Sequence, residues 1–195
     1  MLNENTHKEL SNFARNVVKF SRSNLTRQNK NSSKKLYNSL DFELNVSQNS
    51  FGLAFVMETY GIFQDVGVKG KDPSKVMGGA KTKRGQQAPN SPYRFGSGTH
   101  KGTWNIFVQS LTSWVKKKGY RFRDEKGKFK EGSQKSLAEL IASNIYYRGL
   151  KPSLFFTKPF EAAFKKLPDE LVEKFGLDVD KFLEFTTKES LNVNV

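Results

Sequence analysis

The sequence predicts an α+β protein, with a small antiparallel β-sheet packed against several α-helices and a long basic loop. Three patterns predict this class. Apolar residues recur at helical spacing near the N-terminus and again after residue 103. Between them, two short runs alternate apolar and polar residues, as strands with one buried face do. Residues 69–102 show no period and are punctuated by Gly and Pro.

These patterns divide the chain into three predicted segments. Residues 1–40 form an N-terminal helical segment, and residues 41–167 form an α+β core domain that includes the extended loop 69–102. Residues 168–195 form a C-terminal helical extension and tail. A chain of 195 residues is of the length expected for one domain with arms.

The first predicted helix runs from about Thr6 to Ser23. Thr6 and Glu9 match a capping box, in which each side chain bonds the backbone N–H of the other residue. The apolar stripe consists of Leu10, Phe13, Ala14, Val17 and Val18, and the polar face carries Lys8, Arg15, Lys19 and Arg22. A short second helix is predicted over Ser33–Leu40.

A β-hairpin is predicted next. Its turn is Ser47–Ser50, and its alternating apolar residues are Phe42, Leu44 and Val46, then Phe51, Leu53, Phe55 and Met57. A lone hairpin is only marginally stable, so its apolar face needs a covering helix or a further strand.

Regular structure resumes near Thr103 with a helix that Gly119 ends, after three lysines that favour the helix C-terminus. A charged linker with a small hairpin follows over 120–132. The next helix starts at Ser136, with Ser133 as a competing start, and Gly149 and Pro152 end it. A Phe-rich helix within 153–166 and a last helix from Pro168 complete the chain.

Composition excludes several classes of site. The chain has no Cys, which excludes disulfides, thiolate metal sites and cysteine nucleophiles. The two histidines, His7 and His100, are expected to be solvent-exposed, and the acidic residues form no carboxylate pair suited to acid–base chemistry. Gly78–Lys83 lacks the spacing of a nucleotide-binding loop. We therefore expect no enzyme activity, no cofactor and no metal.

The N-terminus lacks the apolar stretch of a signal peptide, and no window of eighteen apolar residues occurs. We expect a protein without a membrane partner that is made in the cytosol. Its net charge of +14 favours negatively charged partners.

The basic loop holds the candidate contact residues. Its stretch from Lys71 to Gly102 carries seven Lys and Arg, one Asp and no Glu. Two interleaved aromatic residues could stack on bases. The cations suit nucleic-acid phosphates and an acidic protein groove equally well, and a solvated loop is the third alternative. The candidates are Lys69, Lys71, Lys75, Lys81, Lys83, Arg84, Tyr93, Arg94, Phe95 and Lys101.

Five short motifs occur in a fixed order along the chain. They are Tyr60-Gly-x-Phe-x-Asp-x-Gly-Val-Lys-Gly70, Pro92-Tyr-Arg-Phe-Gly96, Trp114-Val-x-Lys-x-Gly119, Ala138-x-x-Ile-Ala-x-x-Ile-Tyr-x-x-Gly149, and Lys151-Pro-Ser-Leu-Phe-Phe156. In this order and spacing the chain resembles the tail-completion or neck proteins of tailed bacteriophages, the head–tail connector group. It is most similar to the versions in phages of Bacteroidetes hosts. The likeness covers roughly Asp41 to Phe164, and the long loop and the last thirty residues depart from it.

The resemblance implies a non-enzymatic structural protein of the virion, assembled in the host cytoplasm. Such proteins form a homo-oligomeric ring between portal and tail, contact the neighbouring portal, adaptor and tail proteins, and let packaged DNA pass through the channel. The family fold is α+β, with a third strand expected within 120–130 or 149–155. The loop would be an arm that orders on contact. The alternative function is a basic nucleic-acid-binding protein that acts through its loop.

Overall fold

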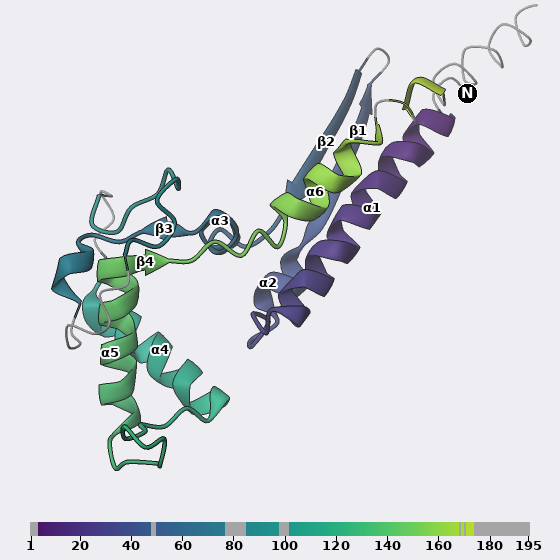
Figure 1. Ribbon diagram of the computed structural model, residues 1–195. Coiled ribbons are helices and arrows are strands. Elements are labelled where there is room, and N and C mark those ends of the chain that lie inside the picture. The colour runs from purple at the N-terminus through teal and green to yellow at the C-terminus, as the bar shows by residue number, and fades with distance from the viewer. Residues whose placement is uncertain are drawn as a thin grey trace, which may run out of the picture. The chain divides into compact units, whose positions relative to one another are not determined.

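The computed structural model describes residues 4–47, 50–76, 85–97, 102–167, 169 and 171–173. Over these residues the chain forms seven helical segments and two antiparallel pairs of strands, so the α+β class is confirmed, with helix predominating (Figure 1). None of the helices in this described part is long and apolar enough to cross a membrane.

Contacts divide the chain into two compact units. Unit 1 consists of residues 1–58 and 155–195, and unit 2 consists of residues 59–154. This division differs from the three predicted segments. The N-terminal helix and the hairpin that follows it share one hydrophobic core, so the chain does not divide near residue 41.

The longest helix of unit 1, α1, spans Glu4–Arg27, and the short α2 spans Lys35–Ser39. Both predicted helices are therefore confirmed. The predicted capping box is wrong, because α1 begins before Thr6 and Thr6 is buried within it. The apolar stripe of α1 is buried as its spacing requires, with Val17 and Leu25 fully enclosed.

The hairpin consists of β1 (Asp41–Ser47) and β2 (Ser50–Val56). Its register places Phe42 opposite Phe55 and Leu44 opposite Leu53, so these side chains share one face. That face packs against α1 and against α6, which spans Thr157–Phe164. The predicted hairpin is confirmed, and residues 48 and 49 of its turn lie outside the described residues.

Aromatic rings join the distant parts of unit 1. The Phe55 ring meets the rings of Phe13, Phe156 and Phe160 edge to face, at centroid distances of 6.3, 5.2 and 5.9 Å. Phe155 is fully buried. The prediction that the Phe-rich C-terminal part supplies core is therefore confirmed, although Phe164 is half exposed.

Unit 2 contains α3 (Gly61–Val66), β3 (Val68–Lys69) and the 3₁₀ turn η1 (Pro73–Lys75). It continues with α4 (Trp104–Lys118), α5 (Gln134–Arg148) and β4 (Gly149–Leu150). The short helix α3, which begins directly after Tyr60, is not among the predicted elements. A third strand does occur in the 149–155 region, but β4 pairs with β3 and not with the hairpin of unit 1.

Helices α4 and α5 pack through small and branched residues. Val108 and Val115 of α4 meet Ala138 and Ala142 of α5, and all four are buried. Gly119 ends α4 in the left-handed conformation at φ 67°, as predicted. Ser133, the competing start, is the N-cap of α5, because its Oγ accepts the backbone N–H of Ser136 at 3.0 Å.

Candidate functional site

Segments from three of the five motifs meet at one place in unit 2, with β3 in the middle. On one side, the backbone N–H of Lys69 donates to the carbonyl of Tyr93 at 2.8 Å, and that of Phe95 donates to the carbonyl of Lys69 at 2.9 Å. On the other side, β3 pairs with β4. The motifs therefore describe a small backbone junction, which we call the motif junction.

At two motif positions in this junction, neighbouring backbone lies so close that only glycine fits. Gly149 has φ +99°, and a Cβ there would collide with the carbonyl oxygen of Val68. A Cβ on Gly70 would collide with the carbonyl of Tyr147. The positions of Gly70 and Gly149 in the motifs therefore follow from the fold and need no catalytic explanation.

The described parts of the long loop are held by the body of unit 2. The buried Ser91 donates its hydroxyl proton to the carbonyl of Gly67 at 2.7 Å. The backbone N–H of Gln87 donates to the carbonyl of Arg148 at 2.7 Å, and Ala88 is buried. Residues 69–76 and 85–97 are thus pinned at several points, whereas the sequence predicts a flexible stretch that leaves the body.

The structure gathers three of the predicted loop cations. Lys71, Lys75 and Arg94 line a hollow of about 340 Å³ together with Asp72, Phe95 and Tyr147. We call this set the loop cluster. Lys69 lies in β3, and the predicted candidates Lys81, Lys83, Arg84 and Lys101 lie outside the described residues.

The charges of the loop cluster are engaged within the protein. Arg94 donates from Nη2 to the carbonyl of Lys71 at 3.0 Å, and the Lys71 Nζ lies 5.7 Å from the centre of the Tyr146 ring. The Lys75 Nζ lies 4.0 Å from the Asp72 carboxylate. Hydrogen bonds from the Ser74 hydroxyl and backbone N–H hold the pKa of Asp72 below its ordinary value, with a smaller contribution from the nearby Lys75 and Arg94.

The two predicted stacking residues pack against their own chain. Tyr93 meets Phe63 edge to face at 4.7 Å between ring centroids. Phe95 lies against Phe107 and Tyr146 at 6.5 and 5.9 Å. Both side chains are half-buried, so they fix the loop to the body and offer little free ring surface for bases.

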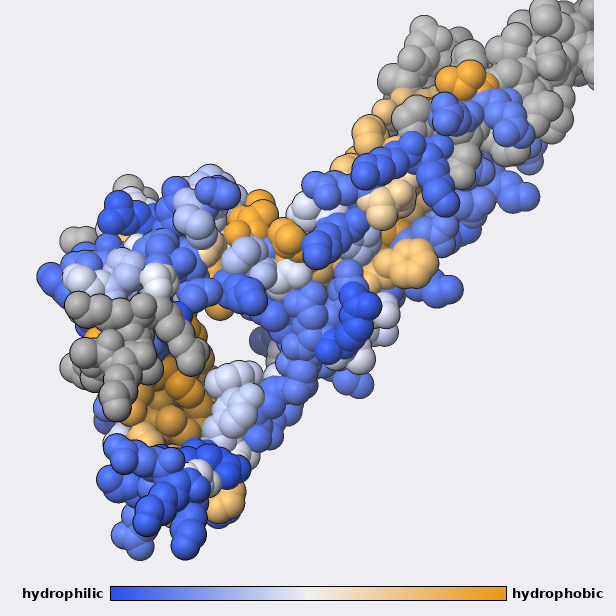
Figure 2. Space-filling view, in the orientation of Figure 1, coloured by the Kyte–Doolittle hydropathy of each residue, from blue (hydrophilic) through white to orange (hydrophobic). Residues whose placement is uncertain are grey.

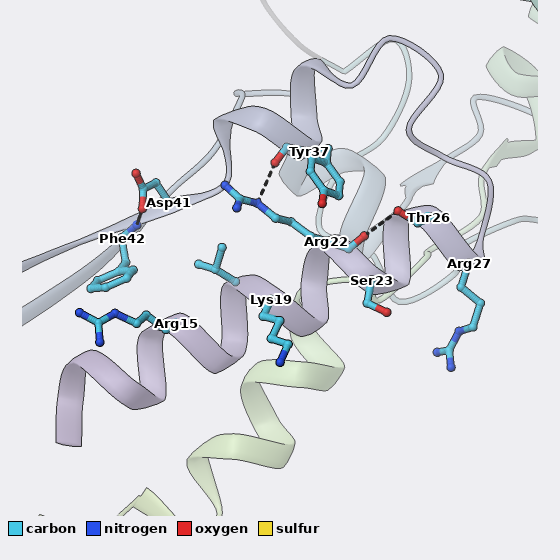
Figure 3. A pocket seen from close by; sticks show the side chains of 10 residues that line it. Arg15, Lys19, Arg22, Ser23, Thr26, Arg27, Tyr37, Asp41 and Phe42 are labelled. Atoms are coloured by element: carbon cyan, nitrogen blue, oxygen red, sulfur yellow. Dashed lines mark hydrogen bonds between the residues drawn. The ribbon is translucent and has the colours of Figure 1, made fainter. Parts of the chain in front are cut away.

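Unit 1 holds a larger cationic hollow, and its lining residues are not among the ten candidates predicted from the sequence. It has a volume of about 620 Å³ and lies along α1, as Figure 3 shows. We call it the α1 groove. Its lining residues are Arg15, Val18, Lys19, Arg22, Ser23, Thr26, Arg27, Tyr37, Asp41 and Phe42. The spacing of Arg15, Lys19 and Arg22 on the polar face of the predicted helix is the signal that could have revealed it.

An apolar face is exposed on α4 and α5. Trp104 and Leu140 are 43% and 37% exposed, and with Tyr146 and Tyr147 they line a hollow of about 650 Å³. Figure 2 shows hydrophobic residues gathered over these two helices. We call this surface the α4–α5 face.

Comparisons with known proteins identified no relative of this chain. No family model, curated protein or solved structure matches this chain. Within the described ranges, no group of three or more His, Asp or Glu side chains is placed to hold a metal ion.

Proposed function

We propose that this protein is a structural subunit of the neck or tail-completion region of a phage virion. In this role it forms a homo-oligomeric ring between portal and tail through which DNA passes, and it contacts the neighbouring portal, adaptor and tail proteins. The type of particle comes from the ordered motifs. The assembly role is supported by one structural observation, the exposed α4–α5 face.

Large apolar side chains grouped on a surface mark sites of protein contact more often than scattered ones do. The chain is polar overall, with 36% hydrophobic residues, so a grouped set is informative. Each subunit of a ring contacts two neighbours through two different surfaces. The α4–α5 face would supply one of these surfaces, because aromatic side chains are enriched at the centres of protein interfaces.

Immunogold electron microscopy of purified virions of the encoding phage tests the assignment. An antibody against the purified chain should label the junction between head and tail. Because the epitope of this antibody could be covered in the virion, a second sample that carries a peptide tag at the C-terminus of the chain is labelled in parallel with an antibody against the tag. Labelling elsewhere on the particle, or virions that contain none of this chain by mass spectrometry, would contradict the proposal.

A matched pair of variants tests the assembly face. Leu140→Glu places a charge on the α4–α5 face, and Val172→Glu places one at a position of unit 1 that is 74% exposed. In phage lacking its own copy and supplied with each variant, Leu140→Glu should reduce particle yield at least tenfold, while Val172→Glu should leave it within twofold. Equal yields for the two variants would remove the α4–α5 face from the proposal.

Nucleic-acid binding through the loop is the second candidate function. The loop cluster supports it, because Lys71, Lys75 and Arg94 surround one hollow. Gel shifts of duplex DNA at two salt concentrations test it, since each neutralised phosphate contributes about −0.9 to the slope of log affinity against log salt. Binding that persists unchanged when these three residues are replaced by Gln would exclude this candidate.

A further inference from the structure

The α1 groove is built from one long helix and two short elements. Cationic side chains of α1 lie along its length, and α2 and the start of β1 contribute Tyr37, Asp41 and Phe42. In Figure 3 the Arg15 guanidinium lies beside the Phe42 ring, and Arg22 reaches Tyr37. The groove belongs entirely to unit 1.

Its cations lie four, three and five residues apart along α1. Arg15 and Arg27 are twelve residue steps apart, which at about 1.5 Å per step is about 18 Å of helix. Arg15, Lys19 and Arg22 fall in one stripe, because residues three and four apart are neighbours on a helix surface. The groove therefore presents a line of positive charge and not a single point.

Two of these charges are available to a ligand. Arg15 and Lys19 are exposed, and neither has a hydrogen bond or ion pair with the part of the chain that the structure describes. The carboxylate among the lining residues, Asp41, accepts the backbone N–H of Phe42 through Oδ1 at 2.9 Å. In Figure 3 this carboxylate points away from the Arg15 guanidinium.

A third charge is fixed in place. The Arg22 Nε donates to the carbonyl of Tyr37 at 3.0 Å, its Nη2 donates to the carbonyl of Leu40 at 2.7 Å, and its guanidinium lies 5.4 Å from the centre of the Tyr37 ring. No carboxylate among the described residues pairs with it. Its positive charge is held in the wall of the groove without being neutralised, so a bound anion would meet a preorganised cation.

We propose that the α1 groove binds the backbone phosphates of a nucleic-acid strand. One strand of duplex DNA carries a negative charge about every 3.4 Å along the axis, so an 18 Å groove faces about five phosphates. Four cations and the Ser23 hydroxyl are of the residue types that contact phosphate oxygens. An acidic protein surface is a weaker match, because its carboxylates do not repeat at a fixed short spacing as the phosphates of a strand do.

The groove is suited to recognise the phosphate charge of a nucleic acid and not its base sequence. Its two aromatic residues, Tyr37 and Phe42, are half-buried and pack on the core of unit 1, so their rings are not free to stack on bases. Phosphate contacts position a protein on nucleic acid without selecting a sequence. We therefore expect similar affinity for strands of different sequence. This inference uses only charges of unit 1 and does not rest on the proposed place in a virion.

Fluorescence anisotropy with a labelled duplex of about 20 base pairs tests the inference, because an 18 Å groove occupies only part of that length. The full-length protein is titrated at low and moderate salt, as wild type and as two double variants. Arg15→Gln with Lys19→Gln removes the two available groove charges. Lys8→Gln with Lys158→Gln removes two exposed charges of the same unit that do not line the groove. Both variants lower the net charge equally, and thermal unfolding verifies that both remain folded.

The groove variant should bind at least tenfold more weakly at low salt. Its salt slope should be smaller than that of wild type by about 1.8, because two phosphate contacts at about 0.9 each are lost. The control variant should stay within twofold of wild type. Equal losses for the two variants, or no binding of wild type at low salt, would overturn the inference.

Two further probes define the ligand. A single strand of the same length reports whether the groove needs a duplex, and either strand form that is sensitive to the groove variant supports the inference. Polyglutamate of matched charge is the acidic-protein probe. If polyglutamate binds as tightly as DNA and loses the same affinity in the groove variant, the groove is a site for acidic protein and the inference fails. Virion labelling can succeed or fail independently of every one of these results.

Discussion

The α1 groove and the loop cluster are both cationic hollows, but they use their charges differently. In the loop cluster, Arg94 bonds a carbonyl of its own chain and Lys75 has a carboxylate 4.0 Å away. In the α1 groove, Arg15 and Lys19 have no such partner within the described part of the chain. Positive charge in a sequence therefore does not tell which cations remain available to a ligand.

The two hollows also differ in what holds their walls. The α1 groove is formed by a 24-residue helix whose opposite face is buried in a hydrophobic core. The loop cluster is formed by backbone hydrogen bonds around two-residue strands. Packing should therefore control the first hollow, and backbone geometry should control the second.

The largest effect is expected from damage to the core of unit 1. Leu25→Ala removes a fully buried side chain of α1 and should lower the free energy of unfolding of unit 1 by about 3–5 kcal/mol. Amide hydrogen exchange at increasing denaturant concentration measures the free energy of unfolding of each unit separately. The exposed Ser23→Ala on the same helix is the control. Equal loss of protection in both units would show that they do not unfold separately, and the comparison would fail.

A somewhat smaller effect is expected from strain at the motif junction. Gly149→Ala places a Cβ against the Val68 carbonyl at φ +99°, which should cost unit 2 about 3 kcal/mol. Gly102→Ala is the matched control, because nothing lies within 4 Å of its Cβ position. Hydrogen exchange should show loss of protection in unit 2, beginning at β3 and β4, while unit 1 keeps its protection. Tolerance of Gly149→Ala would mean that backbone geometry does not hold the loop cluster.

The regular elements of unit 1 could be predicted because their periods are complete. Helix α1 repeats its apolar residues from Leu10 to Leu25, over about four turns, and the hairpin alternates over two full strands. The short helix α3 was not predicted, since its six residues are too few to establish a period. The sequence also carries no pattern that predicts the attachment of residues 85–97 to the body of unit 2. Their backbone hydrogen bonds to Lys69 and Arg148 do not depend on side-chain type.

The candidate site was predicted less well than the fold for a similar reason. The sequence places many cations in one loop, and four of the ten candidates lie outside the described residues. The α1 groove depends on α2 and β1 closing over the polar face of α1, through the bonds of Arg22 to Tyr37 and Leu40. Those contacts span 15 and 18 residues, and helical spacing alone does not reveal them.

A direct comparison of the two hollows should give a moderate difference. Lys71→Gln with Lys75→Gln removes two charges of the loop cluster, one of which already faces Asp72. We expect DNA affinity to fall less than threefold, against at least tenfold for the Arg15 and Lys19 pair, because exposed cations that already have partners contribute little. The same anisotropy titration measures both. A larger loss from the loop pair would restore the loop as the main contact and reverse the comparison.

The smallest effect concerns the anion of the loop cluster. Ser74→Ala removes the hydroxyl that donates to Asp72 Oδ1 at 2.6 Å, so the pKa of Asp72 should rise toward the ordinary value of 3.8. A carboxyl with a lowered pKa stabilises the fold above its unfolded pKa, and this contribution is lost as pH falls through the folded pKa. Ser74→Ala should therefore weaken the η1 turn slightly at neutral pH and reduce its sensitivity to acid. Titration of the Asp72 carboxyl carbon by NMR measures the shift. If the pKa does not move, the Ser74 hydroxyl is not what lowers it, and the backbone N–H of residue 74 together with Lys75 and Arg94 holds the carboxylate ionised.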